Sequence, residues 1–282
     1  MGSATHIFSV DVEEYFQVSA MEPYVQRSQW ESLESRVEHC VDQLLYLLSD
    51  HGAKGTFFTL GWIAERHQRM IERISAGGHE IASHGWDHRR VTELEPEEFR
   101  DSVRRSKAVL EDLACTSVVG FRAPSFSIVE GREWALDILA EEGYQYDSSL
   151  FPVARKGYGY AKGKRYPHWL STSNGKLFEL PPTTMRRFGL SLPSAGGGYF
   201  RLLPYFLTRE ALLEAESQGQ PGMFYIHPWE IDPDQPRFRV SAKTRLRHYG
   251  GLGRTTRKLE QLLMEFQFSS IGELIDALKR RD

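Results

Sequence analysis

The stretch His6-Ile-Phe-Ser-Val-Asp-Val-Glu13 contains the first predicted strand of the chain and two carboxylates at its end. Its apolar and β-branched residues favour a buried strand over residues 6–12. Asp11 and Glu13 are two positions apart, so they face the same side of an extended chain. Carboxylates at a strand end are ordinarily solvated rim residues. A pair on one face also permits a division of labour, in which one binds a metal and the other accepts a proton.

Short apolar segments alternate with longer amphipathic segments along the rest of the chain. We expect further strands at 55–60, 80–83, 117–122, 144–147, 177–180 and 223–227. We expect helices at 37–49, 63–76, 96–113, 132–142, 255–266 and 271–278. Such alternation predicts a largely parallel sheet covered by helices. The expected fold class is therefore α/β, in one domain over residues 1–282.

Two segments do not fit the alternation. Residues 155–175 lack periodicity and are expected to form a long loop over the mouth of a barrel. Residues 196–198 are three glycines and are expected to form a flexible turn.

The composition excludes several classes of protein. The chain has 282 residues, of which 40% are hydrophobic and 26% charged, and its formal net charge is -3. Such a charge creates no global field for nucleic acid or an anionic membrane. Cys40 and Cys115 have no metal-ligand spacing and are too few for a disulfide framework. No apolar run reaches the roughly 18 residues of a membrane span. The first residues also lack the basic and apolar regions of a secretory signal, so we expect a cytoplasmic protein.

Two histidines follow the predicted strand 80–83, in the sequence His84-Gly-Trp-Asp-His88. Imidazoles four residues apart on a helical turn point the same way and can share one cation. A carboxylate would complete a set of two histidines and one acid, with positions left open for water and substrate. Two surface histidines are the alternative, and the position directly after an apolar strand favours the metal.

Three more polar residues come at the ends of predicted strands: Arg122, Asp147 and His227. Strand carboxyl ends meet at one mouth of a β/α barrel, so residues distant in sequence converge there. The alternatives are a salt bridge between Arg122 and Asp147 and a core histidine at 227.

These elements together resemble the polysaccharide deacetylase family, the carbohydrate esterases that share the chitooligosaccharide-deacetylase homology domain. Five motifs occur in the family order: Ser9-Val-Asp-Val-Glu13, His84 to His88, Arg122-Ala-Pro124, Asp147-Ser-Ser149 and Ile226-His227. The segments Asp11 to Val18 and Gly196 to Pro204 resemble most closely the bacterial branch associated with exopolysaccharide and exosortase genes. The resemblance implies a distorted, incomplete (β/α) barrel, with residues 240–282 as a helical C-terminal extension.

The resemblance also implies roles for these residues. Asp11 would be the general base, oriented by Arg122, and His227 would be the general acid, held and tuned by Asp147. One divalent cation, zinc most often in the family, would be bound by Glu13, His84 and His88. The reaction would hydrolyse the N-acetyl group of an N-acetylhexosamine-containing glycan or glycolipid, and contact with a lipid-linked glycan would be peripheral.

The sequence departs from the family pattern at two places. Val12 stands where the family has its metal-binding Asp, so the ligand is Glu13 or Glu14, and Glu13 shares a strand face with Asp11. Ser125 stands where the family has Tyr, so the aromatic wall there depends on Phe126. Trp86 and Trp229 are further candidates for stacking on a sugar ring, although ordinary core packing is the alternative for each.

Two other functions are compatible with the same residues. One is an amide or imide hydrolase that acts on a non-sugar substrate. The other is a non-catalytic carbohydrate-binding relic, which the presence of every residue type needed for catalysis disfavours.

Overall fold

The structure is a computed structural model that describes residues 4–155, 157–187 and 189–280. The first three residues, part of the segment in which we expect no secretory signal, lie outside the described residues. No helix in the described part of the chain is long and apolar enough to cross a membrane.

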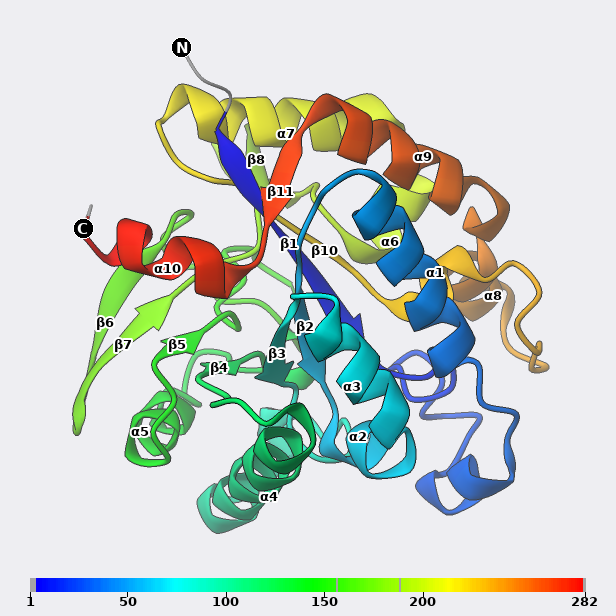
Figure 1. The fold of residues 1–282 in the computed structure, drawn as a ribbon, viewed down its shortest axis with the longest axis horizontal. Helices are drawn as coiled ribbons and strands as arrows, with labels where there is room; N and C mark the ends of the chain where they lie inside the picture. The colour runs from blue at the N-terminus through cyan, green and yellow to red at the C-terminus, as the bar shows by residue number, and fades with distance from the viewer. Residues whose placement is uncertain (1–3, 156, 188, 281–282) are drawn as a thin grey trace.

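The central sheet curls into an open barrel (Figure 1). Its strands are, in spatial order, β10 (Met223–Ile226), β1 (Thr5–Val12), β2 (Thr56–Thr59), β3 (Glu80–Ser83), β4 (Gly120–Phe121), β5 (Tyr146–Asp147), β7 (Gly175–Glu179) and β6 (His168–Thr172). Neighbouring strands are parallel except for β6 and β7. The order begins at β10 and ends at β6, so the barrel does not close among these strands. The expected α/β fold, a distorted and incomplete (β/α) barrel, is confirmed.

Helices cover the outer face of this sheet, as the alternating pattern predicts. The helices of the structure are α1 (Val37–Asp50), α2 (Gly61–Arg66), α3 (Gln68–Ala76), α4 (Pro96–Ala114), α5 (Trp134–Glu141), α6 (Gly197–Leu202), α7 (Tyr205–Ser217), α8 (Ala242–Tyr249), α9 (Leu252–Glu265) and α10 (Ile271–Lys279). Of these, α10 packs with Ile7 and Phe58, which lie on the opposite face of the sheet from Phe8 and Phe57. Single 3-10 turns are η1 (Arg27–Ser32), η2 (Val91–Glu93), η3 (Pro124–Phe126) and η4 (Pro228–Ile231). The main apolar core lies between these helices and the sheet and includes Phe8, Leu44 and Phe57.

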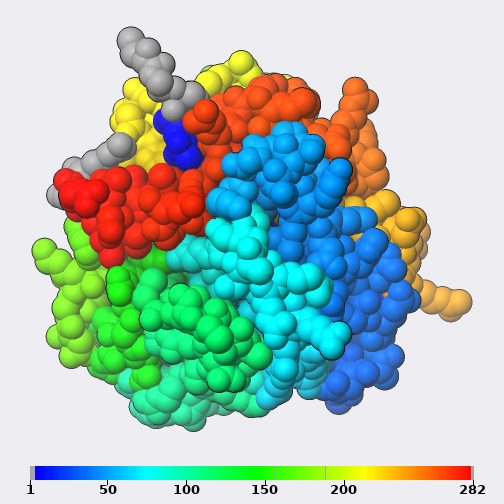
Figure 2. Space-filling model, in the orientation of Figure 1, coloured from blue at the N-terminus to red at the C-terminus, as the bar shows by residue number. Residues whose placement is uncertain are grey.

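The two ends of the chain meet on one side of the sheet. Strand β11 (Gln267–Ser269) pairs in parallel with Thr5–Ile7 of β1. Figure 2 shows the result on the surface, where blue N-terminal and orange-to-red C-terminal segments lie side by side. The segment 240–282 therefore contains a strand of the central sheet in addition to its helices.

Several elements differ from the sequence prediction. The helix expected at 63–76 is two helices, α2 and α3, because the backbone leaves the helical region at His67, whose ring contacts Glu38 of α1. The expected loop at 155–175 contains β6, which pairs with β7. The glycine segment at 196–198 opens α6 instead of forming a turn. The hairpin of β8 (Thr184–Arg187) and β9 (Leu190–Pro193) and the helices α7 and α8 were not predicted.

The parallel sheet places the expected polar residues at one edge. Asp11 lies near the carboxyl end of β1, His84 directly follows β3, Arg122 follows β4 and His227 follows β10. Since all four strands are parallel, these carboxyl ends open toward the same side of the barrel.

Candidate active site and metal centre

The residues at the strand ends surround one cavity of about 650 Å³. Its wall includes Asp11, Glu13, His84, His88 and His227, which come from three separate strands and the loops that follow them. A cavity of this size is typical of small-molecule and cofactor sites. The structure thus brings together five of the seven residues that the sequence marked as catalytic or metal-binding.

Glu13, His84 and His88 form a buried group suited to a metal ion. Each offers one ligand atom, and these atoms all lie within 4.8 Å of one another. Two imidazoles and one carboxylate are a ligand set used for divalent transition metals, with positions left open for water and substrate. The group is the one that the sequence predicted.

The protonation states of this group also fit a metal. Burial lowers the pKa of His84 to about 4, so the imidazole is neutral at pH 7. Its Nδ1–H donates to the backbone carbonyl of Arg122 at 2.7 Å, which leaves Nε2 for the cavity. Burial alone would raise the pKa of Glu13, but the nearby imidazoles of His88 and His227 lower it to about 2.

Two buried atoms of this group, Glu13 Oε2 and His88 Nδ1, lack a hydrogen-bond partner in the described part of the chain. Among the described residues, Glu13 Oε2 has no hydrogen bond, although His88 Nε2 lies 2.7 Å away. Buried polar atoms are normally satisfied, so an orphaned carboxylate oxygen beside an imidazole fits a cation site. The residues present therefore fit a divalent cation.

The loop that carries the two histidines is not the helical turn that we expected. Residues 84–88 form an irregular loop in which Gly85 and His88 have positive φ values of 77° and 60°. Backbone hydrogen bonds from the start of α2 hold the loop, with Gly61 N donating to Gly85 O and Trp62 N to Trp86 O, both at 2.9 Å. The histidine rings still approach each other, with centroids 5.7 Å apart.

Glu14 has a structural role, which separates it from Glu13. Its carboxylate accepts hydrogen bonds from Ser35 Oγ and from the backbone N–H groups of Arg36 and Val37. Val37 is the first residue of α1, so Glu14 satisfies N–H groups that a helix start leaves unpaired. The geometry favours Glu13 as the metal ligand.

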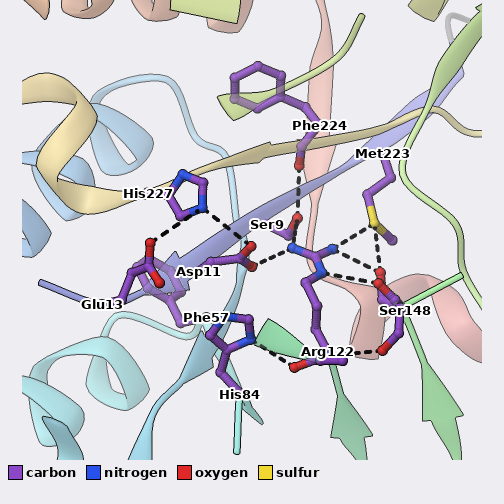
Figure 3. A network of polar contacts seen from close by, with 12 residues as sticks. Ser9, Asp11, Glu13, Phe57, His84, Arg122, Ser148, Met223, Phe224 and His227 are labelled. Carbon is purple, nitrogen blue, oxygen red and sulfur yellow. Dashed lines mark hydrogen bonds and ion pairs between the residues drawn. The ribbon is translucent and has the colours of Figure 1, made fainter. Parts of the chain in front are cut away.

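Arg122 pairs with Asp11 and not with Asp147 (Figure 3). Its Nη1 donates to Asp11 Oδ1 at 2.6 Å and to Ser9 Oγ at 3.0 Å, and its Nη2 donates to Ser148 Oγ at 2.9 Å. The guanidinium is fully buried, because Arg122 is 0% exposed. The suggested Arg122–Asp147 salt bridge is therefore wrong, whereas the expected contact that orients Asp11 is present.

The His227 side chain lies beside both cavity carboxylates. Its Nε2 is 3.8 Å from Asp11 Oδ2 and 3.6 Å from Glu13 Oε1, as Figure 3 shows. Its Nδ1–H donates to Glu230 Oε2 at 2.9 Å. Burial alone would lower the pKa of His227, but Glu13, Glu230 and Asp11 raise it to about 9. The imidazolium is thus favoured at neutral pH.

Glu230 is itself held by a buried arginine. Arg201 Nε donates to Glu230 Oε1 at 2.7 Å, and both side chains are 1% exposed. Burial would raise the pKa of Glu230, but His227 and Arg201 lower it to about 2. Arg201, Glu230 and His227 therefore form a continuous charged chain that ends in the cavity.

Asp147 does not contact His227, which corrects the expectation that it tunes the acid. Its carboxylate accepts from Ser149 Oγ at 2.6 Å and from Ser149 N at 3.1 Å. Burial raises the pKa of Asp147 and of the neighbouring Glu179, so this carboxyl pair favours a shared proton. Asp147 organises the loop after β5 instead.

The aromatic candidates divide into two kinds. Trp229 and Phe126 line the cavity, as does Ser125. The indole of Trp229 stacks on His227 at 5.4 Å and donates from Nε1 to Glu13 Oε1 at 3.3 Å, so it supports the site besides walling it.

Trp86 is not among the cavity-lining residues. Its ring lies against Gly61, where an added Cβ would come within 2.4 Å of it, and under the guanidinium of Arg105 at 3.3 Å. This packing corrects the expectation that Trp86 stacks on a sugar.

Backbone strain is concentrated around the cavity. Among the described residues, four non-glycine residues have positive backbone φ angles. Three of them, His88, Ser125 and Phe126, line the cavity. Such conformations cost free energy and cluster at functional sites.

Three residues of the site were not expected from the sequence. Glu230 follows His227 by three positions and was detectable as an acid at the third position after a strand end. Arg201 and His248 carried no comparable signal, because they lie on α6 and α8, far from His227 in sequence. His248 stacks on Trp229 at 4.4 Å, and burial lowers its pKa to about 3.

Two family models match the chain in succession. Residues 32–146 match the model described as polysaccharide deacetylase. Residues 148–276 match a domain of unknown function, DUF3473. The region that matches the polysaccharide deacetylase model holds His84, His88 and Arg122, whereas the DUF3473 region supplies His227, Glu230 and Arg201, so both matched regions contribute to the site.

Curated relatives match only part of this chain. A peptidoglycan-N-acetylglucosamine deacetylase of Bacillus cereus is 30% identical over 96 residues, which are 34% of this chain and 35% of that protein. The chain spans about a third of the length of the first curated relatives it matches.

Solved structures share the fold over the whole chain. A crystal structure from Mycobacterium smegmatis, assigned to the polysaccharide deacetylases, covers 100% of this chain and 96% of that one, with a TM-score of 0.66 and 20% identity. A Bacillus anthracis protein described as a CE4 family pseudoenzyme has a TM-score of 0.50 and 14% identity, and covers 97% of this chain and 66% of that one. The fold therefore occurs without activity, and the function must be argued from the site.

Proposed function

We propose that this protein is a metal-dependent carbohydrate de-N-acetylase, which hydrolyses the N-acetyl group of an N-acetylhexosamine-containing glycan or glycolipid. The products would be acetate and a free amino sugar. The observation that carries the proposal is the meeting of three elements in one cavity: the Glu13, His84 and His88 group, the Asp11 carboxylate and the His227 imidazole. The family matches support the same chemistry.

A divalent cation held by Glu13, His84 and His88, for which we propose zinc, would polarise the acetamide carbonyl and lower the pKa of a bound water. Asp11, fixed by Arg122 at 2.6 Å, would accept the proton from the attacking water. The carboxylate is buried and already oriented, so little rearrangement is needed before the reaction.

The amine leaves only after it is protonated, and His227 would donate that proton. The nearby carboxylates raise the pKa of His227 to about 9 against the effect of burial, so the charged form is available at neutral pH. Glu230 would hold the ring through Nδ1, which directs Nε2 toward the cavity. The proposed base and the proposed acid thus line the same cavity.

Acetate release tests the proposal directly. We would remove metal with a chelator, restore zinc or another divalent cation, and incubate the protein with oligomers of N-acetylglucosamine. Acetate should appear only with metal. A metal-restored, folded protein that releases no acetate from any N-acetylated sugar would contradict the proposal.

Assays with other substrates distinguish the proposed function from the two alternative functions. An amide or imide hydrolase acting on a non-sugar substrate would release product from cyclic imides or ureides and none from N-acetyl sugars. A carbohydrate-binding relic would bind the oligomers without turnover. Membership of the exopolysaccharide and exosortase branch and the cytoplasmic location remain predictions.

A further inference from the structure

The cavity has a second chemical character besides its metal and acid–base groups. Three cationic side chains, Arg155, Lys243 and Arg247, line the same cavity as Asp11 and His227. All three lie in the DUF3473 region, which therefore contributes a basic part of the cavity wall. All three are exposed to solvent and so accessible to a ligand.

None of these cations forms an ion pair with a carboxylate of the described residues. Two of the three carboxylates that line the cavity pair with buried arginines, Asp11 with Arg122 and Glu230 with Arg201, and the third, Glu13, belongs to the proposed metal group. The positive charges at the cavity wall are therefore not neutralised from within the cavity.

Two of the cations, Arg155 and Arg247, act electrostatically on the same tyrosine in the cavity wall. The hydroxyl groups of Tyr158 and Tyr199, both cavity-lining, lie 2.7 Å apart. Burial raises the pKa of Tyr158, and the charges of Arg155 and Arg247 act in the opposite direction. Their fields thus overlap at this tyrosine pair, although the two arginines lie on a loop and on α8.

Basic residues in the surrounding sequence add to the positive electrostatic potential at the cavity wall. Residues 236–259 contain eight Lys and Arg residues and no Asp or Glu, whereas the whole chain has a net charge of -3. Two of these eight residues, Lys243 and Arg247, lie on α8 and line the cavity. A cavity with a wall of one sign attracts ligands of the opposite sign.

We propose that the substrate is an acidic glycan, in which the N-acetylated sugar at the metal centre is joined to a phosphate or carboxylate group that Arg155, Lys243 and Arg247 bind. This inference rests on the proposed deacetylase function and narrows its substrate class. Arginine binds both phosphate and carboxylate through paired N–H groups, so the same three side chains could bind either anion.

Three probes test the substrate class. They are a neutral oligomer of N-acetylglucosamine, N-acetylglucosamine 1-phosphate, and an oligomer in which N-acetylglucosamine alternates with glucuronic acid. We would measure equilibrium binding and acetate release for each, at low and at high salt. An anionic probe should bind about tenfold more tightly than the neutral one at low salt, and the difference should shrink at high salt.

The variant combines Arg155→Gln, Lys243→Gln and Arg247→Gln. Its ratio of anionic to neutral affinity should fall to about one, because the charges that distinguish the probes are gone. The matched control combines Arg69→Gln, Lys176→Gln and Arg257→Gln, which removes the same charges from exposed positions outside the cavity. The control should keep the preference, and thermal unfolding of both variants checks that they fold.

The outcomes separate this inference from the proposed function. Equal binding of all probes by the unmodified protein, or an unchanged preference in the cavity variant, would overturn the acidic substrate, and the cations would be solvated surface charges. Preferential binding of an anionic probe without acetate release from any probe would support the anion site and contradict the deacetylase. A preference between the two anionic probes would identify the anion.

Discussion

His227 Nδ1 lies 2.9 Å from Glu230 Oε2, and the two residues are three positions apart, at the end of β10 and in η4. Glu230 is bound on its other side by Arg201, so its charge is stabilised while it stabilises the imidazolium. This short contact takes the place that we expected Asp147 to have. Because His227 and Glu230 are neighbours in sequence, the acid and its partner are positioned by one turn of backbone.

Glu230→Gln should move the alkaline limb of the pH–rate profile to lower pH. A general acid is active below its pKa and inactive above it, and removing the adjacent negative charge lowers the pKa of His227 from about 9. The pH at which this limb falls is obtained from the rate of acetate release as a function of pH. Glu72→Gln, at an exposed site on α3, should leave the limb in place.

The thermal unfolding of the Glu230→Gln variant is measured together with its pH–rate profile. The substitution leaves the buried Arg201 without a charged partner, which should lower the free energy of unfolding by about 3–5 kcal/mol. A folded Glu230→Gln protein with the limb unmoved would show that Glu230 does not tune His227.

Asp11→Asn should retain metal but lower the turnover number by about two to four orders of magnitude, as expected for the loss of a general base. The amide cannot accept the proton, while Glu13, His84 and His88 are untouched. Acetate release gives the rate, and elemental analysis gives the metal content. Asp112→Asn, at an exposed site on α4, is the control. Near-full activity of Asp11→Asn would show that another group is the base.

His84→Ala should abolish metal-dependent stabilisation. A ligand that binds only the folded state stabilises it, by about 2.7 kcal/mol at one hundred times its Kd. Added zinc should therefore raise the Tm of the unmodified protein and change that of the variant little. His39→Ala, on the exposed face of α1, should respond as the unmodified protein does. An equal zinc response of His84→Ala would place the metal elsewhere.

Asp147→Asn should alter stability and leave the alkaline limb unchanged. The side chain is buried against Ser149 and Glu179 and does not touch His227, so its effect is on the loop after β5. The free energy of unfolding, measured by chemical denaturation, should change by about 1–3 kcal/mol. A shift of the limb as large as that of Glu230→Gln would restore Asp147 as the partner of His227.

Much of the fold could be predicted because local patterns and the tertiary structure agree. The strand at His6 to Val12, the helix from residue 37 and the strand at 80–83 occur where their patterns placed them. The β8–β9 hairpin and β6 were missed because their pairing partners, and not their own periodicity, define them. The backbone leaves the helical region at His67, and the hydrophobic period of 63–76 continues across that position without marking it.

Five residues of the candidate site could be predicted from the sequence, because successive parallel strands bring their carboxyl ends to one edge wherever the helices between them lie. That rule placed Asp11, Glu13, His84, His88 and His227 together. Only the tertiary structure decided which side chain partners which. Arg122 turns toward Asp11, Arg201 reaches Glu230 from α6, and Arg155, Lys243 and Arg247 border the cavity. Such contacts join residues far apart in the chain, so they depend on how the helices and loops pack and not on any local period.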